Sequence, residues 1–224
     1  MKNKKKYVIS IDQGSTSTRC VIYDDELNSI ASSQYKLDEI YPKEGWVELD
    51  PNQIIESVLY TIKDVVSKSE IDKEKIISIG ITNQRETIVF WDKLNLKPIT
   101  NAISWQCLRG KEICDKLKGS KFEELLVDST GLKLDPYFSF SKIVWAIENN
   151  KTIYKLLAQN KLNFGTIDSW LLANIIEGSP HKIEVTNASR TGLYNTKLED
   201  WDAELLSILG INRSFLPKIF SSNE

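Results

Sequence analysis

Histidine and cysteine are scarce in this chain of 224 residues, which contains one histidine and three cysteines. Because His181 is the only histidine, the sequence argues against a Ser-His or Cys-His nucleophile pair. Cys20, Cys107 and Cys114 are too few and too scattered for a disulfide framework, and their spacing is not typical of a zinc site. These shortages argue against a triad hydrolase, and we expect three buried, reduced thiols.

An excess of basic charge is also missing, because 29 Lys and Arg face 31 Asp and Glu. This balance gives no support to a nucleic-acid or acidic-membrane partner. No run approaches the roughly 20 apolar residues that span a bilayer. The lysines at positions 2, 4, 5 and 6 precede a strand without an apolar segment, so they indicate a solvated tail rather than a secretory signal. We expect a cytoplasmic protein with small-molecule partners, no nucleic-acid partner and no membrane span.

What is present is ordinary globular composition, 41% apolar and 27% charged. Apolar runs at 7–11, 19–23 and 30–35, separated by polar turns, predict an antiparallel meander. Further strands are expected at 76–81 and 87–91. Helices are expected near 108–118, 122–128, 138–149, 166–177 and 201–209. Strands that pair early and then alternate with helices predict an α/β fold.

The clearest helix signal begins at Asp50, which is a good N-cap before Pro51, with Gln53 placed to complete a capping box. The helix is expected to end near residue 68. Apolar residues at helical spacing predict its buried stripe: Ile55, Val58, Leu59, Ile62, Val65 and Val66.

The first turn, at 12–19, carries the most chemistry. A buried strand delivers Asp12 to a turn with Gly14 and four consecutive hydroxyls, after which Arg19 follows. Backbone amides near a glycine, hydroxyls and a guanidinium all suit phosphate, and one carboxylate suits a hydrated Mg²⁺. A plain hairpin turn is an equally good reading of this segment alone. Walker A and Gly-x-Gly-x-x-Gly patterns are missing, which disfavours P-loop and Rossmann sites.

Six motifs in order give a more specific indication: SIDQG at 10–14, YPKEGWVE at 41–48, GITNQRET at 80–87, WQC at 105–107, DPYFS at 135–139 and TNASRT at 186–191. Together they resemble the glycerol kinases of the FGGY carbohydrate-kinase family over essentially the whole chain. The resemblance implies a ribonuclease H-like domain of the actin, hexokinase and Hsp70 type. Its mixed sheet would open with an antiparallel meander and be flanked by helices. It also implies that residues 1–224 form the N-terminal FGGY domain.

The resemblance implies glycerol contacts at Arg85, Glu86, Trp105 and Tyr137. Their chemistry suits a small polyol, because Arg donates to hydroxyl oxygens, Glu accepts from hydroxyl hydrogens, Tyr does either and Trp covers C–H groups. Taken singly, Arg85–Glu86 could be a surface pair, and the two aromatics could be core residues.

By the same resemblance, ATP phosphates are expected at the first turn, with Mg²⁺ at Asp12. The expected phosphate contacts are Ser15, Thr16, Ser17 and Arg19. The chain departs from the family pattern at three positions. Ser15 stands for a threonine, which keeps the hydroxyl, so binding is expected to survive. Leu108 stands for an arginine and Phe140 for a small residue, which points to altered packing near Tyr137.

The family's catalytic base is an aspartate in a Gly-Asp-Gln segment, which is expected beyond Glu224, so no catalytic residue is assigned here. The resemblance therefore implies ATP-dependent phosphorylation of glycerol by an intact enzyme, with a C-terminal domain as partner and little turnover by this chain alone. Homo-oligomers are left open. Two alternatives remain: a sugar kinase of the same family, against which the Asn83-Gln84-Arg85-Glu86 segment speaks, and a non-catalytic binding or regulatory module.

Overall fold

The structure is a computed structural model that describes residues 5–223, so the lysines at 2 and 4 lie outside it, whereas Lys5 and Lys6 are exposed. The chain divides into two compact units. Unit 1 comprises the residues up to 39 together with 49–84, and unit 2 comprises 40–48 and the residues from 85 onward.

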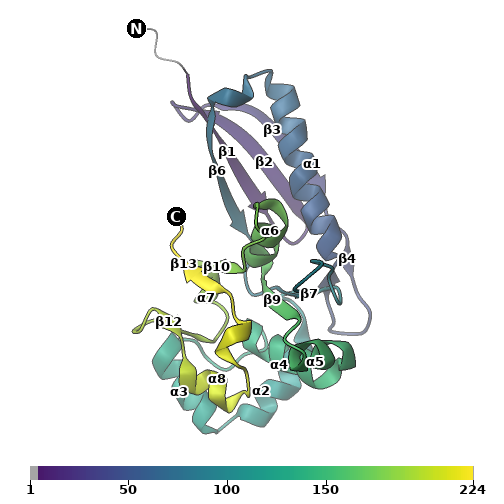
Figure 1. Cartoon of the computed structure of the whole chain (residues 1–224), viewed down its shortest axis with the longest axis vertical. Coiled ribbons are helices and arrows are strands. Elements are labelled where there is room, and N and C mark those ends of the chain that lie inside the picture. Colours follow the sequence, from purple (N-terminus) through teal and green to yellow (C-terminus); the bar gives the residue numbers. More distant parts are fainter. Residues whose placement is uncertain (1–4, 224) are drawn as a thin grey trace. The chain divides into compact units, whose positions relative to one another are not determined.

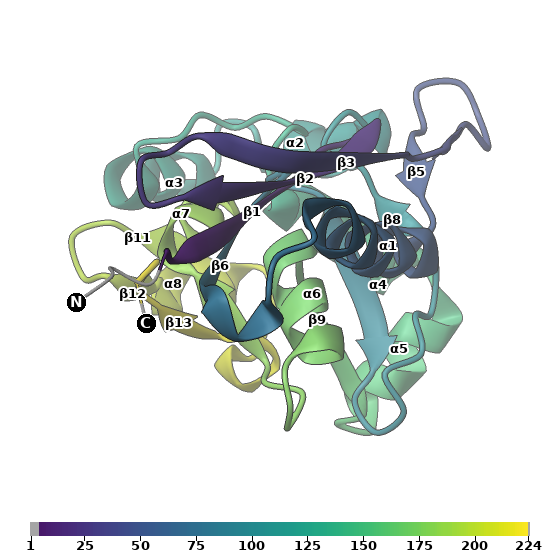
Figure 2. The same cartoon turned by 90° about the horizontal axis from the view of Figure 1, so that it is seen from above.

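Unit 1 is built on a four-stranded sheet, in the order β3-β2-β1-β6. Its strands are β1 (Tyr7–Gln13), β2 (Ser17–Asp24), β3 (Ser29–Lys36) and β6 (Ile76–Asn83). The first three pair antiparallel, which confirms the predicted meander, and β6 runs parallel to β1. Helix α1 (Pro51–Ser69) lies along one face of this sheet, mainly over β2 and β3 (Figures 1 and 2). A short 3₁₀ turn, Lys73–Lys75, leads into β6.

The start of α1 agrees with the sequence in part. Asp50 caps the helix by accepting a hydrogen bond of 2.8 Å from the Asn52 N–H, and Pro51 occupies the first helical position. The predicted capping box is wrong, because the Gln53 amide instead makes two hydrogen bonds with Asp38, one to its main-chain N–H and one to its carboxylate. Gln53 therefore ties α1 to the loop before it.

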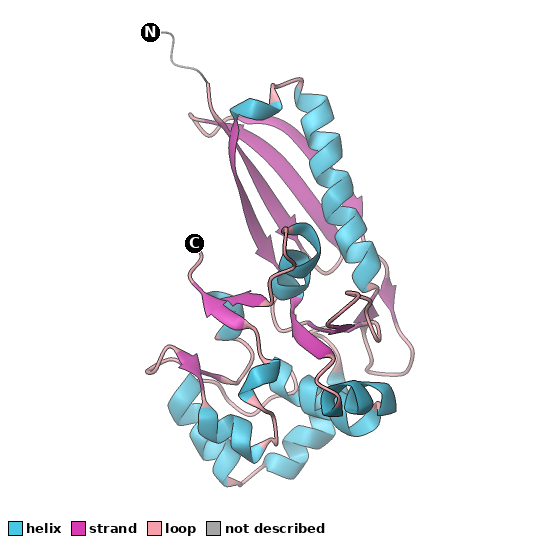
Figure 3. Cartoon of the chain, viewed as in Figure 1, coloured by secondary structure: helices cyan, strands magenta, loops and turns pink. Residues whose placement is uncertain are grey.

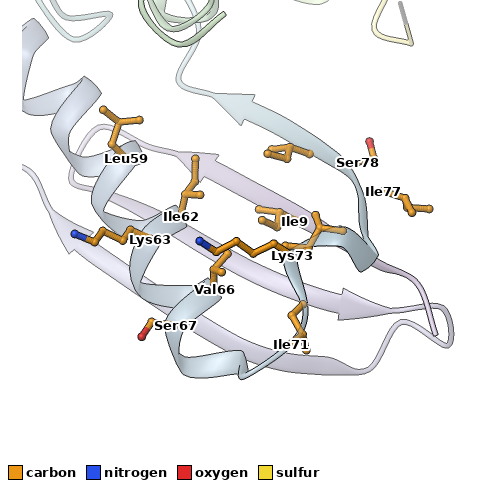
Figure 4. Close-up of a pocket in the computed structure, with 12 residues that line it drawn as sticks. Ile9, Leu59, Ile62, Lys63, Val66, Ser67, Ile71, Lys73, Ile77 and Ser78 are labelled. Carbon is orange, nitrogen blue, oxygen red and sulfur yellow. The ribbon is translucent and has the colours of Figure 1, made fainter. Parts of the chain in front are cut away.

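The buried face of α1 is also displaced from the predicted stripe. Ile54, Val58 and Val65 are fully buried, whereas Leu59 is 50% exposed. Because α1 packs mainly on β2 and β3, the other edge of the stripe is left beside an open apolar groove. Figure 4 shows Leu59, Ile62 and Val66 of α1 lining this groove together with Ile9 of β1 and with Ile71, Lys73 and Ile77.

Unit 2 contains more helix (Figure 3). Its largest sheet has the order β4-β5-β8-β7-β9. These strands are β4 (Glu39–Ile40), β5 (Glu48–Leu49), β7 (Ile88–Asp92), β8 (Ala102–Ile103) and β9 (Leu162–Thr166). Two smaller sheets pair β10 (Lys182–Glu184) with β13 (Lys218–Phe220), and β11 (Tyr194–Asn195) with β12 (Asp200–Trp201).

The helices of unit 2 are α2 (Lys111–Leu117), α3 (Lys121–Thr130), α4 (Ser139–Asn149), α5 (Lys151–Ala158), α6 (Ile167–Ile175), α7 (Val185–Ala188) and α8 (Ala203–Ile208). Two 3₁₀ turns, Leu108–Gly110 and Arg213–Phe215, accompany them. All five helices predicted for this region are present with shifted ends. The predictions omitted α5, α7, β9 and the strands of two or three residues.

The core of unit 2 accommodates one departure from the family pattern. Phe140 is fully buried and its ring lies 5.2 Å from that of Phe122. Opposite it, Gly192 has φ +76°, and a Cβ atom there would lie 2.6 Å from the Phe140 ring. The large side chain at 140 therefore fits because the facing residue has none.

The cysteines are confirmed as free and buried. Burial raises the pKa of Cys20 to about 11, and that of Cys114 to about 11. His181 is mostly enclosed, its ring hydrogen-bonds to the Phe164 carbonyl, and burial lowers its pKa. Within residues 5–223, the structure has no helix with the length and apolar character needed to cross a membrane.

Candidate functional site

The predicted phosphate turn is a tight hairpin in unit 1. The Gly14 N–H donates to the Ser17 carbonyl at 2.9 Å, which closes the turn between β1 and β2. Of the predicted contacts, Ser15 and Ser17 are half-buried, and Thr16 and Arg19 are exposed. A Cβ atom on Gly14 would lie 3.2 Å from the Ser17 carbonyl oxygen, so the close approach of the two strands favours glycine here.

Strand alternation decides which side chains of this hairpin are accessible. Asp12 and Arg19 are direct cross-strand partners, and both are exposed on the sheet face opposite α1. Thr18 points to the other face, where its hydroxyl lies 2.6 Å from the hydroxyl of Ser57 on α1. Among the four hydroxyls of the turn, that of Thr18 is therefore used in packing, and the other three remain candidates for phosphate.

Gln84, at the end of β6, is a part of this hairpin that sequence reasoning missed. Its main-chain N–H donates to the Gln13 carbonyl at 2.7 Å, and its amide donates to the Gly14 carbonyl at 3.1 Å. The Ser15 hydroxyl in turn donates to the Gln84 amide oxygen at 3.4 Å. The position of Gln84, polar and directly after an apolar strand, was the available signal.

The donor set at Asp12 fits magnesium held mainly by water and phosphate. Asp12 is exposed, and no group of three or more His, Cys, Asp or Glu side chains in the part of the chain that the structure describes could hold a metal alone. Mg²⁺ prefers octahedral oxygen ligands, keeps several waters and commonly uses one or two carboxylates with substrate phosphates. A single accessible carboxylate beside the predicted phosphate turn meets that requirement.

In unit 2, Arg85 and Glu86 form a strained turn. Glu86 has φ +63°, and the Thr87 N–H donates to the Arg85 carbonyl at 2.8 Å, which is the hydrogen bond of a γ-turn with positive φ. Such a conformation costs a non-glycine residue on the order of 1 kcal/mol or more. The Glu86 carbonyl accepts from the buried Ser139 hydroxyl at 3.0 Å, which helps to hold the turn. The result is a buried Glu86, 2% exposed, beside an exposed Arg85.

The two predicted aromatic contacts meet in unit 2. The rings of Trp105 and Tyr137 lie 5.6 Å apart, edge to face, and both residues are half-buried. The main-chain N–H of Trp105 donates to the Thr87 hydroxyl at 3.1 Å, which attaches this segment to the residue after Glu86. The Tyr137 N–H donates to the Asp135 carboxylate at 2.9 Å.

Arg190 joins these parts and was not predicted as a site residue. Its Nε donates to the Glu86 carboxylate at 2.6 Å, and its guanidinium lies 5.7 Å from the Tyr137 ring centre and 5.0 Å from that of Phe138. Burial alone would lower the pKa of Arg190, but the hydrogen bond and charge of Glu86 raise it above its ordinary value. The only sequence signal was its place in the 186–191 motif. Arg190, Glu86 and Tyr137 thus form one cluster with Trp105.

The 41–48 motif has a structural explanation. The Arg109 guanidinium pairs with the Glu48 carboxylate at 2.5 Å and lies 3.9 Å from the Trp46 ring centre and 5.0 Å from that of Trp145. This pair anchors the 40–48 segment within unit 2. Leu108 is 56% exposed, so its departure from the family pattern disturbs no core.

The groove beside α1 is not the candidate site. Its lining is mostly aliphatic, and it includes none of the predicted ligand contacts. The chemistry of the chain is concentrated instead at the β1–β2 hairpin and at the Glu86, Trp105, Tyr137 and Arg190 cluster.

A mixed α/β architecture with a phosphate-type hairpin between antiparallel strands defines the actin and hexokinase class of ATPase folds. Comparison with known proteins agrees. Residues 7–224 match the N-terminal domain of the FGGY family of carbohydrate kinases. The chain belongs to that family.

The relatives found include glycerol kinases. The glycerol kinase of Shewanella piezotolerans is 48% identical, over 98% of this chain and 44% of its own length. The glycerol kinase of Shigella flexneri is 44% identical, over 99% of this chain and 44% of its own length. Among solved structures, Plasmodium falciparum glycerol kinase with ADP has a TM-score of 0.88 at 34% identity, covering 96% of this chain and 43% of that one. Gluconate kinase from Lactobacillus acidophilus has a TM-score of 0.85 at 29% identity, covering 97% and 42%. The chain spans about 44% of the length of the curated relatives that it matches.

Proposed function

We propose that this chain forms the glycerol-binding and phosphate-binding part of an ATP-dependent glycerol kinase. The observation that carries the proposal is the cluster in which Arg190 fixes the Glu86 carboxylate beside the edge-to-face pair of Trp105 and Tyr137. The identity of 44% to 48% to glycerol kinases supports glycerol as the substrate.

The proposed roles follow from donor and acceptor chemistry. The Glu86 carboxylate accepts hydrogen bonds from glycerol hydroxyls, and Tyr137 and the exposed Arg85 donate to their oxygens. Trp105 covers the C–H groups and excludes water. Arg190 holds the Glu86 carboxylate in place as an acceptor.

At the hairpin, we propose that Ser15, Thr16, Ser17 and Arg19 contact the phosphates of ATP. Asp12 would hold Mg²⁺ through its carboxylate and bound water. The metal, when bound, neutralises charge on the phosphates during transfer. The chain's own contribution is to position phosphate oxygens against amides, hydroxyls and one guanidinium.

A sugar kinase of the same family is the second candidate, because gluconate and xylulose kinases share the fold at TM-scores of 0.85. Fold likeness does not separate these substrates, so the side chains at the site must. A ligand panel of glycerol, xylulose and gluconate tests this by equilibrium binding. We expect glycerol to bind best, and preference for xylulose or gluconate would overturn the assignment.

Two variants connect binding to the proposed residues. Glu86→Gln and Tyr137→Phe should each weaken glycerol binding by roughly fivefold to tenfold, the effect of about one lost hydrogen bond. Glu148→Gln and Tyr154→Phe are matched controls, since Glu148 lies in a surface ion pair and Tyr154 is 63% exposed. Equal effects of the site and control variants would contradict the proposal.

Turnover is proposed for a protein that contains this chain together with the remaining length of its relatives. Phosphoryl transfer needs a group that accepts the proton of the attacking hydroxyl. We assign no such base within the chain. A coupled assay of ADP release by the 224-residue chain tests this, and glycerol-dependent turnover would overturn it.

A further inference from the structure

Lys142 on α4 is the one fully buried lysine among the residues that the structure describes. Its ammonium donates to the main-chain carbonyls of Pro136 at 2.7 Å and Tyr137 at 2.6 Å, with a longer contact of 3.4 Å to that of Phe138. All of its recorded hydrogen-bond partners are therefore carbonyl oxygens, and they belong to three consecutive residues.

The stability of α4 does not explain this arrangement. The ammonium lies at the N-terminal end of the helix, where the helix dipole disfavours a positive charge. Burying an ammonium without a paired carboxylate also costs free energy, which only well-made hydrogen bonds offset. The buried ammonium therefore needs another explanation than the stability of α4. The segment to which it donates its hydrogen bonds offers one.

That segment carries Tyr137. Residues 136–138 belong to no helix or strand, and they lie in a turn closed by the Phe138 N–H, which donates to the Asp135 carbonyl at 3.3 Å. Helix α4 follows directly. The Ser141 hydroxyl gives further support by donating to the Phe138 carbonyl at 3.0 Å. With its main chain fixed from α4, Tyr137 places its ring against Trp105 and under Arg190.

We propose that Lys142 is a positioning residue of the substrate site, whose ammonium fixes residues 136–138 and thereby holds the Tyr137 ring against Trp105. The proposal deepens the glycerol-binding function and rests on it. Lys142 contacts no substrate itself in this scheme.

The charge state of Lys142 gives a direct means of testing its role. Burial lowers its pKa to about 8, against the opposing effects of Cys107, Glu86, Cys114 and Asp135, which face it from the neighbouring segments. An ammonium offers three protons to the three carbonyls, whereas a neutral amine offers two and directs a lone pair at oxygen. The hold on residues 136–138 should therefore weaken as the pH rises through about 8.

The experiment is ¹⁹F NMR of the full 224-residue chain labelled with 5-fluorotryptophan. Six resonances are expected from the six tryptophans, and Trp105→Phe assigns the one that matters. Between about pH 6.5 and about pH 9.5, the Trp105 resonance should shift with a midpoint near the lysine pKa. Trp201 and Trp170, which lie outside this cluster, should not follow that midpoint.

Three variants make the result specific. Lys142→Met should abolish the titration of the Trp105 resonance. Lys116→Met, which removes an exposed lysine paired with Glu148, should leave it unchanged. The titration should persist in Cys107→Ser, which eliminates the nearby thiol as its source. A pH-independent Trp105 resonance in the wild-type chain, or a titration that survives in Lys142→Met, would overturn the proposal. The wild-type titration decides the question even if Lys142→Met does not fold.

Glycerol added to the same samples separates this inference from the proposed function. Lys142→Met should weaken glycerol binding by roughly fivefold to tenfold, comparable to losing one hydrogen bond through misplacement of Tyr137. If the wild-type chain fails to bind glycerol, the proposed function fails, while the ¹⁹F titration still decides whether Lys142 controls the Tyr137–Trp105 contact.

Discussion

The β1–β2 hairpin of unit 1 and the Glu86 cluster of unit 2 are built in different ways. The hairpin is local: one short stretch between two paired strands supplies Asp12, the hydroxyls and Arg19, largely on the surface. The cluster draws on residues from 86 to 190, and buried side chains fix its members. A site made by a turn depends on backbone geometry, whereas one made by tertiary contacts depends on the burial and pairing of distant groups.

Breaking the ion pair of Arg190 and Glu86 should have the largest effect on the free energy of unfolding among the changes predicted here. Arg190→Met should lower the free energy of unfolding by about 3 kcal/mol, because it leaves a buried carboxylate without its partner. Adding Glu86→Gln should recover part of the loss, and the double-mutant cycle by urea denaturation measures the coupling.

The matched control for that pair is Lys197→Met, which breaks an ion pair with Asp128 whose two side chains are 62% and 73% exposed. Exposed pairs of this kind contribute about 1 kcal/mol or less. If Arg190→Met costs no more than Lys197→Met, the cluster of unit 2 does not depend on buried pairing.

Glycine substitutions test packing in the two regions. Gly192→Ala should cost about 2 kcal/mol or more, because its φ is +76° and the new Cβ would overlap the buried Phe140 ring. Gly14→Ala should cost less, roughly 1 kcal/mol, since its nearest contact is a single carbonyl at 3.2 Å. Chemical denaturation of both variants gives the comparison, and equal losses would contradict it.

The same difference explains what the sequence could predict. The hairpin, the meander and the Asp50 cap follow from patterns within a few residues, and the structure agrees with them. The capping box failed because Gln53 found a tertiary partner in Asp38, and the stripe of α1 was displaced because sheet packing decides which edge is buried. No local pattern reports either event.

For the candidate site, the family motifs drew attention to Glu86, Trp105 and Tyr137 as ligand contacts. The contacts expected from the resemblance did not include the residues that hold them in place. Arg190 lies 104 positions from Glu86 in the sequence. Lys142 bonds to main-chain carbonyls of residues 136–138, and because every residue has a carbonyl, no sequence pattern indicates these bonds. Positive φ at Glu86 is likewise set by its surroundings rather than by residue type.

Within the hairpin, two neighbouring residues should separate stability from binding. Thr18→Val removes the hydroxyl that meets Ser57 and should cost about 1 kcal/mol of unfolding free energy, with nucleotide binding unchanged. Arg19→Met should change stability by less than about 0.5 kcal/mol and weaken Mg·ATP binding by roughly tenfold or more. Lys36→Met, another exposed cation of the same sheet, serves as the binding control. Loss of nucleotide binding in Thr18→Val, but not in Arg19→Met, would reverse our assignment of the two faces.

The smallest expected effect at neutral pH concerns Asp168, a buried carboxyl of unit 2 away from the cluster. Burial raises its pKa to about 6, although the Thr166 hydroxyl and the Glu184 N–H both donate to it. A raised folded-state pKa means that its stabilising contribution is present below the unfolded value of 3.8 and is lost as pH rises through about 6. Asp168→Asn removes the loss of stability that this carboxyl causes as the pH rises. The free energy of unfolding of the variant should therefore rise more steeply with pH between about 4 and about 6 than that of the wild type. Near neutral pH the change should stay within roughly 1 kcal/mol, because the amide keeps an acceptor for the Glu184 N–H. An unaltered slope in urea denaturation across this pH range would show that Asp168 is ionised in the folded protein, and that unit 2 accommodates a buried charge at this position as well.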